Sequence, residues 1–236
     1  LIRLDRSMDP VPDLASDWTV SDDGLTYTFH LVKGAMWHDG KPVTSADVKY
    51  TVEEVMMKVH PRAGTYGEVI NRVDTPDANT AVFKLNRPFG ALMNGLGYDF
   101  LILPKHIYAG TDVKTNPNNA KPIGSGPFKF KDWVRGSHIT LERNPDYFVK
   151  GLPYLDRLVF RIIPDASSRV MALEAGDIDY LAYMALPSSA VPRLKANKNI
   201  MVTQDGLESL ASILMINLNL DNSVFGDIRV RQAIAH

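Results

Sequence analysis

The sequence contains no cysteine among its 236 residues. This absence excludes disulfide bonds, thiolate metal sites and cysteine nucleophiles within the chain. An excess of charge of either sign is also missing, because 26 lysines and arginines oppose 27 aspartates and glutamates, for a formal net charge of -1. The chain therefore lacks the basic footprint that nucleic acids and anionic lipids attract, and we expect no nucleic-acid partner.

Long apolar runs and paired metal-ligand motifs are missing too. No stretch is apolar over the length that crosses a membrane. The histidines are scattered, and none lies four residues from another, the spacing that would place two imidazoles on one helical face for zinc. We therefore expect no bound metal and no cofactor. The histidines are His30, His38, His60, His106, His138 and His236.

Catalytic motifs are scarce. His38 and Asp39 are neighbours, but adjacent residues of an extended segment point to opposite sides, so a general-base pair is not expected there. Ser125 lies between glycines without the Gly-x-Ser-x-Gly turn from strand to helix that hydrolases use. A hydrolase is therefore disfavoured, since no nucleophile, base and orienting group can be assembled. We expect that the protein is not an enzyme.

Alternating apolar residues predict several strands. In residues 25–31 the apolar side chains alternate with threonine and histidine, which is typical of a strand with one buried face. Residues 155–163 are apolar nearly throughout and favour a strand covered on both faces. Residues 80–85, 137–144 and 209–220 are further predicted strands. The apolar set of the first strand is Leu25, Tyr27, Phe29 and Leu31.

Helical spacing follows two capping signals. Thr44 and Asp47 resemble a capping box before one predicted helix. Asp165 caps another, which Gly176 ends before residues 178–182 alternate as a strand. The mixture of strands and helices predicts an α/β, or mixed α+β, fold. The apolar stripe of the first helix is Val48, Val52, Val55 and Met56.

The stretch GSGPFKFKDW, residues 124–133, contains a short Gly-x-Gly pair. A phosphate loop needs a helix N-terminus directly behind its glycines. Here Pro127 and then aromatic residues follow instead. The stretch therefore predicts a tight turn that enters a strand.

Both ends indicate a fragment of a longer protein. The chain begins LIRLDRSMDP, without an initiator methionine or a signal-peptide pattern, so we expect that any targeting peptide was removed or never included. Near the other end, Asp227 can cap a helix that carries Val230, Ala233 and Ile234 at helical spacing. No stop signal follows, and we expect the natural protein to continue.

Five longer motifs follow one another along the chain. They are DLASDWTVSDDGLTYTFHLVKGAMWHDGKPVTSADVKYT, ILPKHIY, GSGPFKFKDWVRGSHITLERNPDYF, PYLDRLVFRIIPDASSRVMALEAGDIDYL and INLNLDNSVFGDIRVRQAIAH. In this order they resemble the family 5 extracellular solute-binding proteins of ABC importers, which include the dipeptide, oligopeptide and nickel binders. The resemblance covers essentially the whole chain.

The resemblance implies part of a type II periplasmic binding protein-like fold. Such proteins have two lobes that close on a ligand, and an extra domain attached to the first lobe. Residues 1–104 are similar to the extra α+β domain, residues 105–208 to the middle segment of ligand-binding lobe one, and residues 209–236 to the hinge crossing and the start of lobe two. The N-terminal strands of lobe one and most of lobe two would then lie outside this chain. The turn at residues 124–126 would be where the chain re-enters the main lobe.

The function implied by the resemblance is transport without catalysis. The protein would be the substrate-binding component of an ABC transporter, capturing a peptide-like solute in the periplasm or, as a lipoprotein, at the cell surface. It would deliver this solute to the permease transmembrane subunits, as a monomer that meets the membrane only through the permease or a removed lipid anchor. The alternative is the same fold binding a nickel chelate, haem, an opine or an oligosaccharide.

The family also implies positions for the ligand-binding residues. Tyr66 is similar to the cleft tyrosine of the extra domain, whose phenol can donate to ligand. Tyr183 and Met184 follow a predicted strand and are similar to a cleft-lining pair, for which ordinary core or surface positions are the alternative. Ser209 and Leu210 lie at the crossing between lobes, where family members offer main-chain groups to a peptide's amino end. The acidic partner of that amino end would lie in the lobe outside this chain.

Overall fold

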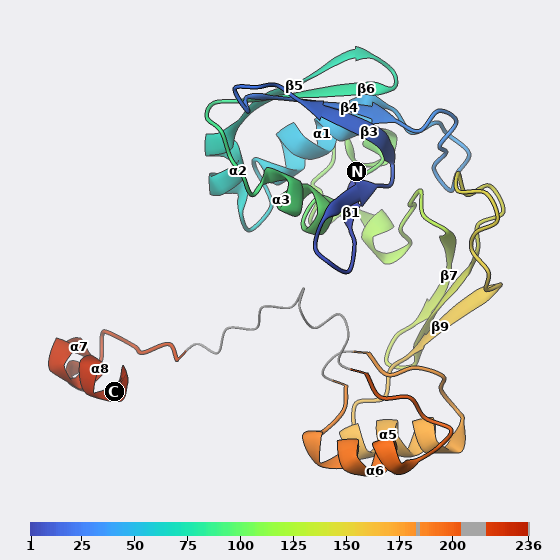
Figure 1. Ribbon diagram of the computed structural model, residues 1–236, viewed down its shortest axis with the longest axis vertical. Coiled ribbons are helices and arrows are strands. Elements are labelled where there is room, and N and C mark those ends of the chain that lie inside the picture. Colours follow the sequence, from blue (N-terminus) through green and yellow to red (C-terminus); the bar gives the residue numbers. More distant parts are fainter. Residues whose placement is uncertain (183–184, 204–215, 236) are drawn as a thin grey trace. The chain divides into compact units, whose positions relative to one another are not determined.

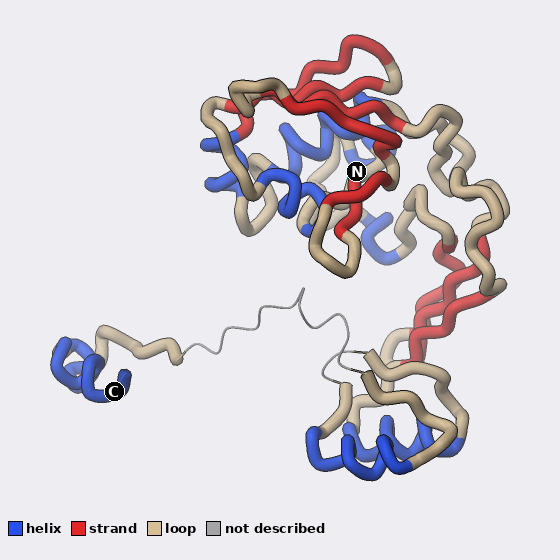
Figure 2. Tube along the Cα trace, viewed as in Figure 1, coloured by secondary structure: helices blue, strands red, loops and turns tan. Residues whose placement is uncertain are grey.

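The computed structural model describes residues 1–182, 185–203 and 216–235. The chain divides into two compact units, Leu1–Val202 and Thr203–His236. Strands and helices mix in the larger unit (Figure 1, Figure 2), which confirms the predicted mixed class. Residues 104 and 105 belong to the same unit, and the division predicted between them stays a prediction. In the described part of the chain, no helix is long and apolar enough to cross a membrane.

A four-stranded antiparallel sheet organises the N-terminal part, with strand order β3-β4-β6-β5. The predicted alternation on β4 is confirmed: Tyr27, Phe29 and Leu31 are buried, while His30 is exposed. The Phe29 ring meets Phe83 of β6 edge to face, with centroids 5.3 Å apart. Leu25, just before the strand, packs partly buried against the same core. The strands are β1 (Ile2–Leu4), β2 (Pro10–Pro12), β3 (Ala15–Val20), β4 (Thr26–Leu31), β5 (Ile70–Asp77) and β6 (Thr80–Leu85), of which β1 and β2 form a separate ribbon.

Helices cover one face of this sheet (Figure 1). The first, α1, begins after Thr44, whose amide donates to the Asp47 carboxylate at 2.8 Å, as the predicted capping box requires. It continues as the π-helical segment η1, and the predicted stripe runs through both, with Val48 and Val52 fully buried. The helical segments are α1 (Ser45–Tyr50), η1 (Thr51–Met56), α2 (Ala63–Val69), α3 (Leu92–Tyr98), α4 (Lys105–Tyr108) and η2 (Pro117–Ala120).

The Asp47 side chain joins three separate segments. Its carboxylate is buried, at 4% exposure. One oxygen accepts from the Thr44 amide at 2.8 Å and from the Trp37 indole at 3.4 Å, and the other accepts from the Lys105 amide at 2.8 Å. A buried carboxylate is tolerated only when its oxygens are hydrogen-bonded. The turn before α1, α1 itself and the start of α4 are therefore fixed to one another at this point.

Replacing Asp47 by asparagine should destabilise the N-terminal part. The amide would turn an N–H₂ group toward backbone or indole donors, leaving buried donors without an acceptor, a loss of about 1–3 kcal/mol. Urea denaturation followed by tryptophan fluorescence would measure it. Asp22→Asn, at an exposed position, is the control and should leave the midpoint unchanged. Equal midpoints for the two variants would contradict the role given to Asp47.

A three-stranded antiparallel sheet, β7-β8-β9, follows the turn at 124–126. The prediction that residues 155–163 form a strand covered on both faces is wrong in its second part. The strand forms, but Val159 and Phe160 are 52% and 54% exposed. Within the described chain, β9 is an edge strand that pairs with β8 alone. An apolar run favours burial on both faces, but burial also requires other segments that pack on those faces. The strands are β7 (Phe128–Val134), β8 (His138–Arg143) and β9 (Arg157–Arg161).

The second predicted helix is α5, with both of its predicted ends. The Asp165 side chain accepts from the Ser168 amide at 2.7 Å, and Gly176 ends the helix in the left-handed conformation, at φ 79°. The strand predicted for residues 178–182 does not form, and Tyr180 is 79% exposed. Alternation makes a strand only where a partner strand can accept its hydrogen bonds, and no such partner lies in the described residues. The helical segments here are α5 (Ala166–Ala175), η3 (Ser188–Ala190) and α6 (Val191–Ala196).

In its described residues, the smaller unit contains two short helices, α7 (Ser223–Gly226) and α8 (Ile228–Ala235). Asp227 caps α8 as predicted, since its carboxylate accepts from the Arg229 amide at 2.9 Å. The strand predicted for residues 209–220 lies mostly outside the described residues.

Truncating Phe29 tests the core of the four-stranded sheet. Phe29→Ala removes a ring that is 0% exposed and in contact with Phe83, so the free energy of unfolding should fall by about 3–5 kcal/mol. Val20→Ala on the neighbouring β3, at a side chain that is 45% exposed, is the control and should change it by less than about 1 kcal/mol. Chemical denaturation would compare the two, and similar losses would mean that β4 does not face the core.

Candidate ligand-binding site

Ligand contacts are predicted at Tyr66, Tyr183, Met184, Ser209 and Leu210. Of these, Tyr66 lies in the described part of the chain. The other four fall in residues 183–184 and 204–215, outside the described residues. Their ligand-binding roles therefore stay predictions.

Tyr66 is a core residue of α2, at 3% exposure. Its ring packs edge to face on Phe100, with centroids 4.8 Å apart. Its hydroxyl donates to the Asp99 carboxylate at 2.5 Å, and Arg62 donates to the same oxygen. The phenol therefore donates its proton to Asp99. The family resemblance instead implies that this phenol can donate to a ligand. A ligand contact at Tyr66 stays a prediction, and it requires the phenol to leave Asp99.

Charge is balanced within this cluster of Arg62, Tyr66 and Asp99. The Asp99 side chain is only 8% exposed, so its charge depends on these two donors. Burial, followed by the hydrogen bond to Asp99, raises the pKa of Tyr66 to about 12. The Asp99 carboxylate in turn raises the pKa of the Arg62 guanidinium. At neutral pH a cation, an anion and a neutral phenol therefore coexist here.

Gly95 of α3 makes room for this cluster. A Cβ at position 95 would lie 2.9 Å from the Tyr66 hydroxyl oxygen, too close for any larger residue without movement. Neither Arg62 nor Asp99 is among the residues predicted from the sequence. The spacing of four between Arg62 and Tyr66 could have suggested a helical pair. Asp99, which follows Tyr66 by 33 residues, is brought there by the fold alone.

The predicted turn at residues 124–126 is present as a bend over residues 125–127, and His38 holds it. The His38 amide donates to the Gly124 carbonyl at 2.8 Å, and the Gly124 amide donates to His38 Nδ1 at 3.2 Å. His38 Nε2 lies 3.0 Å from the Gly126 carbonyl oxygen. A Cβ on Gly124 would stand 3.2 Å from His38 Cε1, so this glycine permits the close approach of the imidazole.

His38 and Asp39 lie in a hydrogen-bonded turn and not in the extended segment expected, and their side chains contact different groups. The Asp39 carboxylate lies 2.7 Å from Nε2 of His106 on α4. The two residues therefore bind different segments, His38 the turn at 124–126 and Asp39 the helix α4. A His38–Asp39 general-base pair is not formed.

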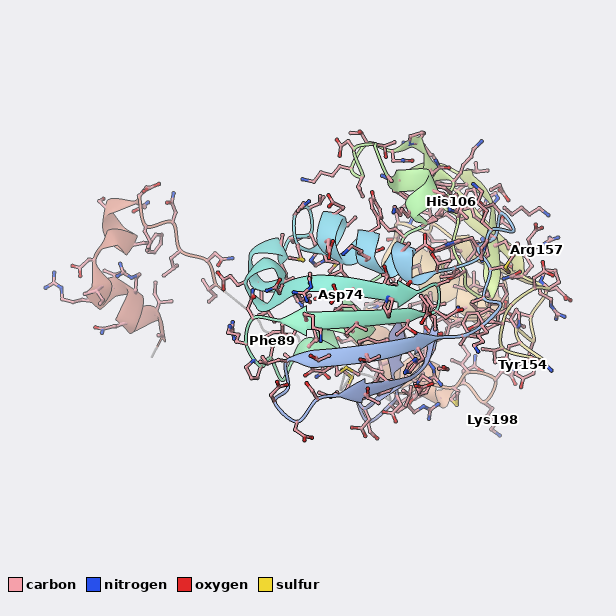
Figure 3. The ribbon with its side chains drawn as sticks, turned by 90° about the horizontal axis from the view of Figure 1, so that it is seen from above. Asp74, Phe89, His106, Tyr154, Arg157 and Lys198 are labelled. Carbon is pink, nitrogen blue, oxygen red and sulfur yellow. The ribbon has the colours of Figure 1, made fainter. Side chains whose placement is uncertain are left out.

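An open hollow of about 360 Å³ lies on one face of β8 and β9. It includes Arg157, which projects from the edge strand (Figure 3). Tyr66 does not line it. The hollow is polar and basic, unlike the largely apolar enclosures in which small molecules are usually buried. Its lining residues are Ser137, His138, Thr140, Arg157, Val159 and Arg161.

Residues 9–236 match the family described as bacterial extracellular solute-binding proteins, family 5 Middle. The chain belongs to this family. It is 36% identical to the oligopeptide-binding protein AppA of Bacillus subtilis over 99% of this chain and 43% of that protein. It is 32% identical to heme-binding protein A of Haemophilus influenzae over 97% of this chain and 44% of that protein.

Solved structures give the same fold. NikZ from Campylobacter jejuni, solved in complex with Ni(L-His), superposes with a TM-score of 0.82 at 28% identity, over 99% of this chain and 46% of that one. This chain therefore has part of the type II periplasmic binding protein fold. It spans under half the length of the relatives that it matches.

Titration of the tyrosines tests the cluster around Asp99. Tyr66 should stay protonated until about pH 12, so one of the nine tyrosines should ionise last in a spectrophotometric titration. Because the pKa is raised on folding, the stability that Tyr66 contributes is complete below the unfolded value near 10 and is lost as pH rises through about 12.

Tyr66→Phe should remove this late step from the titration. The variant should also unfold more easily by about 1–3 kcal/mol at neutral pH, because the buried Asp99 loses one donor. Tyr98→Phe, at an exposed tyrosine of α3, is the matched control and should keep the late step. A late step that survives in Tyr66→Phe would contradict the assignment.

Proposed function

We propose that the protein is the substrate-binding component of an ABC transporter that captures a peptide-like solute. The observation that carries this proposal is the family match over residues 9–236, together with a relative named for oligopeptide binding. The solute would be captured in the periplasm or at the cell surface and passed to the permease transmembrane subunits. The protein would act as a monomer and reach the membrane only through the permease or a lipid anchor.

The proposed site lies between two lobes. Residues 1–104 would be the extra domain, 105–208 part of the first lobe, and 209–236 the hinge crossing and the start of the second. Tyr183 and Met184 would line the cleft. A peptide held like an added strand is recognised chiefly through its main chain, which suits the hinge backbone at Ser209 and Leu210.

A second candidate keeps the fold and changes the solute. The Haemophilus influenzae relative is named for haem, and the Campylobacter jejuni structure holds a nickel–histidine complex. A nickel chelate, haem, an opine or an oligosaccharide is therefore the alternative ligand class. Metal in such a complex is cargo rather than a resident cofactor.

We propose no catalytic activity. The serine closest to a hydrolase pattern, Ser125, lies in the turn that His38 holds. Both ring nitrogens of His38 are engaged by the main chain of Gly124 and Gly126, so this imidazole is not available as a base for Ser125. Sustained turnover of a peptide substrate by the purified protein would contradict this.

Native mass spectrometry of the whole protein, purified without denaturation, would distinguish the two ligand classes. A family of co-purified peptide masses is the expected result. One discrete mass, or a mass that carries metal, would favour the second candidate. After removal of bound material, calorimetric titration with a peptide of the recovered size should give a saturable isotherm, and its failure would contradict the peptide proposal.

The chain of residues 1–236 should bind such a peptide far more weakly than the whole protein. A micromolar complex corresponds to about 8 kcal/mol of binding free energy. A two-lobed site reaches this by enclosing the ligand and desolvating its ends, and this chain spans under half of its relatives' length. Calorimetry on both proteins with one ligand would test this. Equal affinities would place the whole site within residues 1–236.

A further inference from the structure

We propose that His38 is a pH-sensitive latch, closed when its imidazole is neutral and weakened by protonation, that holds the turn at residues 124–126 to the N-terminal core. The turn leads directly into β7, so the latch ties the three-stranded sheet to the part of the chain that carries His38. This inference is independent of the ligand class proposed above.

The hydrogen bonds define one tautomer of His38. The Gly124 amide can only donate, so Nδ1 must accept from it with its lone pair. The Gly126 carbonyl can only accept, so Nε2 must carry the proton. The ring that satisfies both partners is therefore the neutral Nε2–H imidazole.

Protonation adds a hydrogen to Nδ1, the atom that faces the Gly124 amide. Two donors would then oppose each other across 3.2 Å, and that contact cannot persist. The Nε2 bond to Gly126 and the main-chain bond from His38 to Gly124 remain possible. Acid thus removes one of the three bonds and places a charge in a half-buried position.

The surroundings of His38 also favour the neutral form. Burial is the largest cause that lowers the pKa of His38 below its usual value, and Lys129 of β7 adds to the lowering. The Gly126 carbonyl and the Asp39 carboxylate act in the opposite direction but do not outweigh burial. Asp39 is itself engaged by His106, which leaves it poorly placed to stabilise a cation on His38.

The sign of the pH effect follows from this lowering. The ordinary pKa of histidine is about 6.5. Above this pH, His38 is neutral whether the latch is closed or open, and all three hydrogen bonds can form. As pH falls from that value through the lowered folded pKa, the open form takes up the proton first and is favoured.

The other side of the turn does not titrate. Asn144, which is buried, donates from its side chain to the Gly126 carbonyl at 3.0 Å and from its amide to the Pro127 carbonyl at 2.8 Å. Because amides keep their charge state, the turn stays attached to the sheet while its attachment through His38 weakens. Acid should therefore loosen the junction with the N-terminal core and leave the sheet intact.

Hydrogen exchange at the Gly124 amide tests the latch in the intact protein. Its protection factor, corrected for the intrinsic exchange rate, should fall by about three- to tenfold between pH 7.5 and 5.5, the effect of losing one hydrogen bond. Amides of β6 should keep their protection. The decrease should disappear in His38→Gln and persist in His30→Gln, a control at an exposed histidine. A constant protection factor in the parent protein, or the same decrease in His38→Gln, would overturn the proposal.

Nuclear magnetic resonance of the parent protein provides a test that needs no variant. The His38 ring should show the Nε2–H tautomer at pH 7.5, and its titration should coincide with the loss of Gly124 protection. An Nδ1–H tautomer at that pH, or titration of the ring without any change at Gly124, would also overturn the proposal.

Discussion

The buried carboxylate of Asp47 is the constraint on which the N-terminal part depends. A carboxylate removed from water has to find donors, and here they come from three stretches of chain, at Trp37, Thr44 and Lys105. Satisfying one group therefore fixes the entry to α1, the preceding turn and the start of α4 together. Apolar contacts pack the sheet against its helices. The hydrogen bonds of Asp47 fix the positions of the connecting segments at Trp37, Thr44 and Lys105.

The turn beside this point has two histidine contacts of opposite character. His38 serves as a neutral ring between two main-chain groups, whereas His106 meets the carboxylate of Asp39. Protonation of His38 would remove the lone pair that accepts from the Gly124 amide in the first contact. The glycine at position 124 is what allows the ring to approach the main chain.

Tyr66, for which the family resemblance implies a ligand contact, has its polar group engaged inside the protein. Its phenol is buried, donates to Asp99 and leaves no free proton for a ligand. The exposed apolar residues of β9 show the reverse situation, since Val159 and Phe160 have the composition of a covered strand without the cover. The chain spans less than half of the relatives' length.

The sequence by itself determined the features that depend on near neighbours. The alternation on β4, the capping box at Thr44 and the ends of α5 each follow from side chains a few positions apart, and the structure confirms them. Only the tertiary structure decided which distant groups meet. The pairing of Tyr66 with Asp99, the donors to Asp47 and the exposure of β9 depend on segments brought together by folding, and no local pattern records what will lie opposite a given side chain.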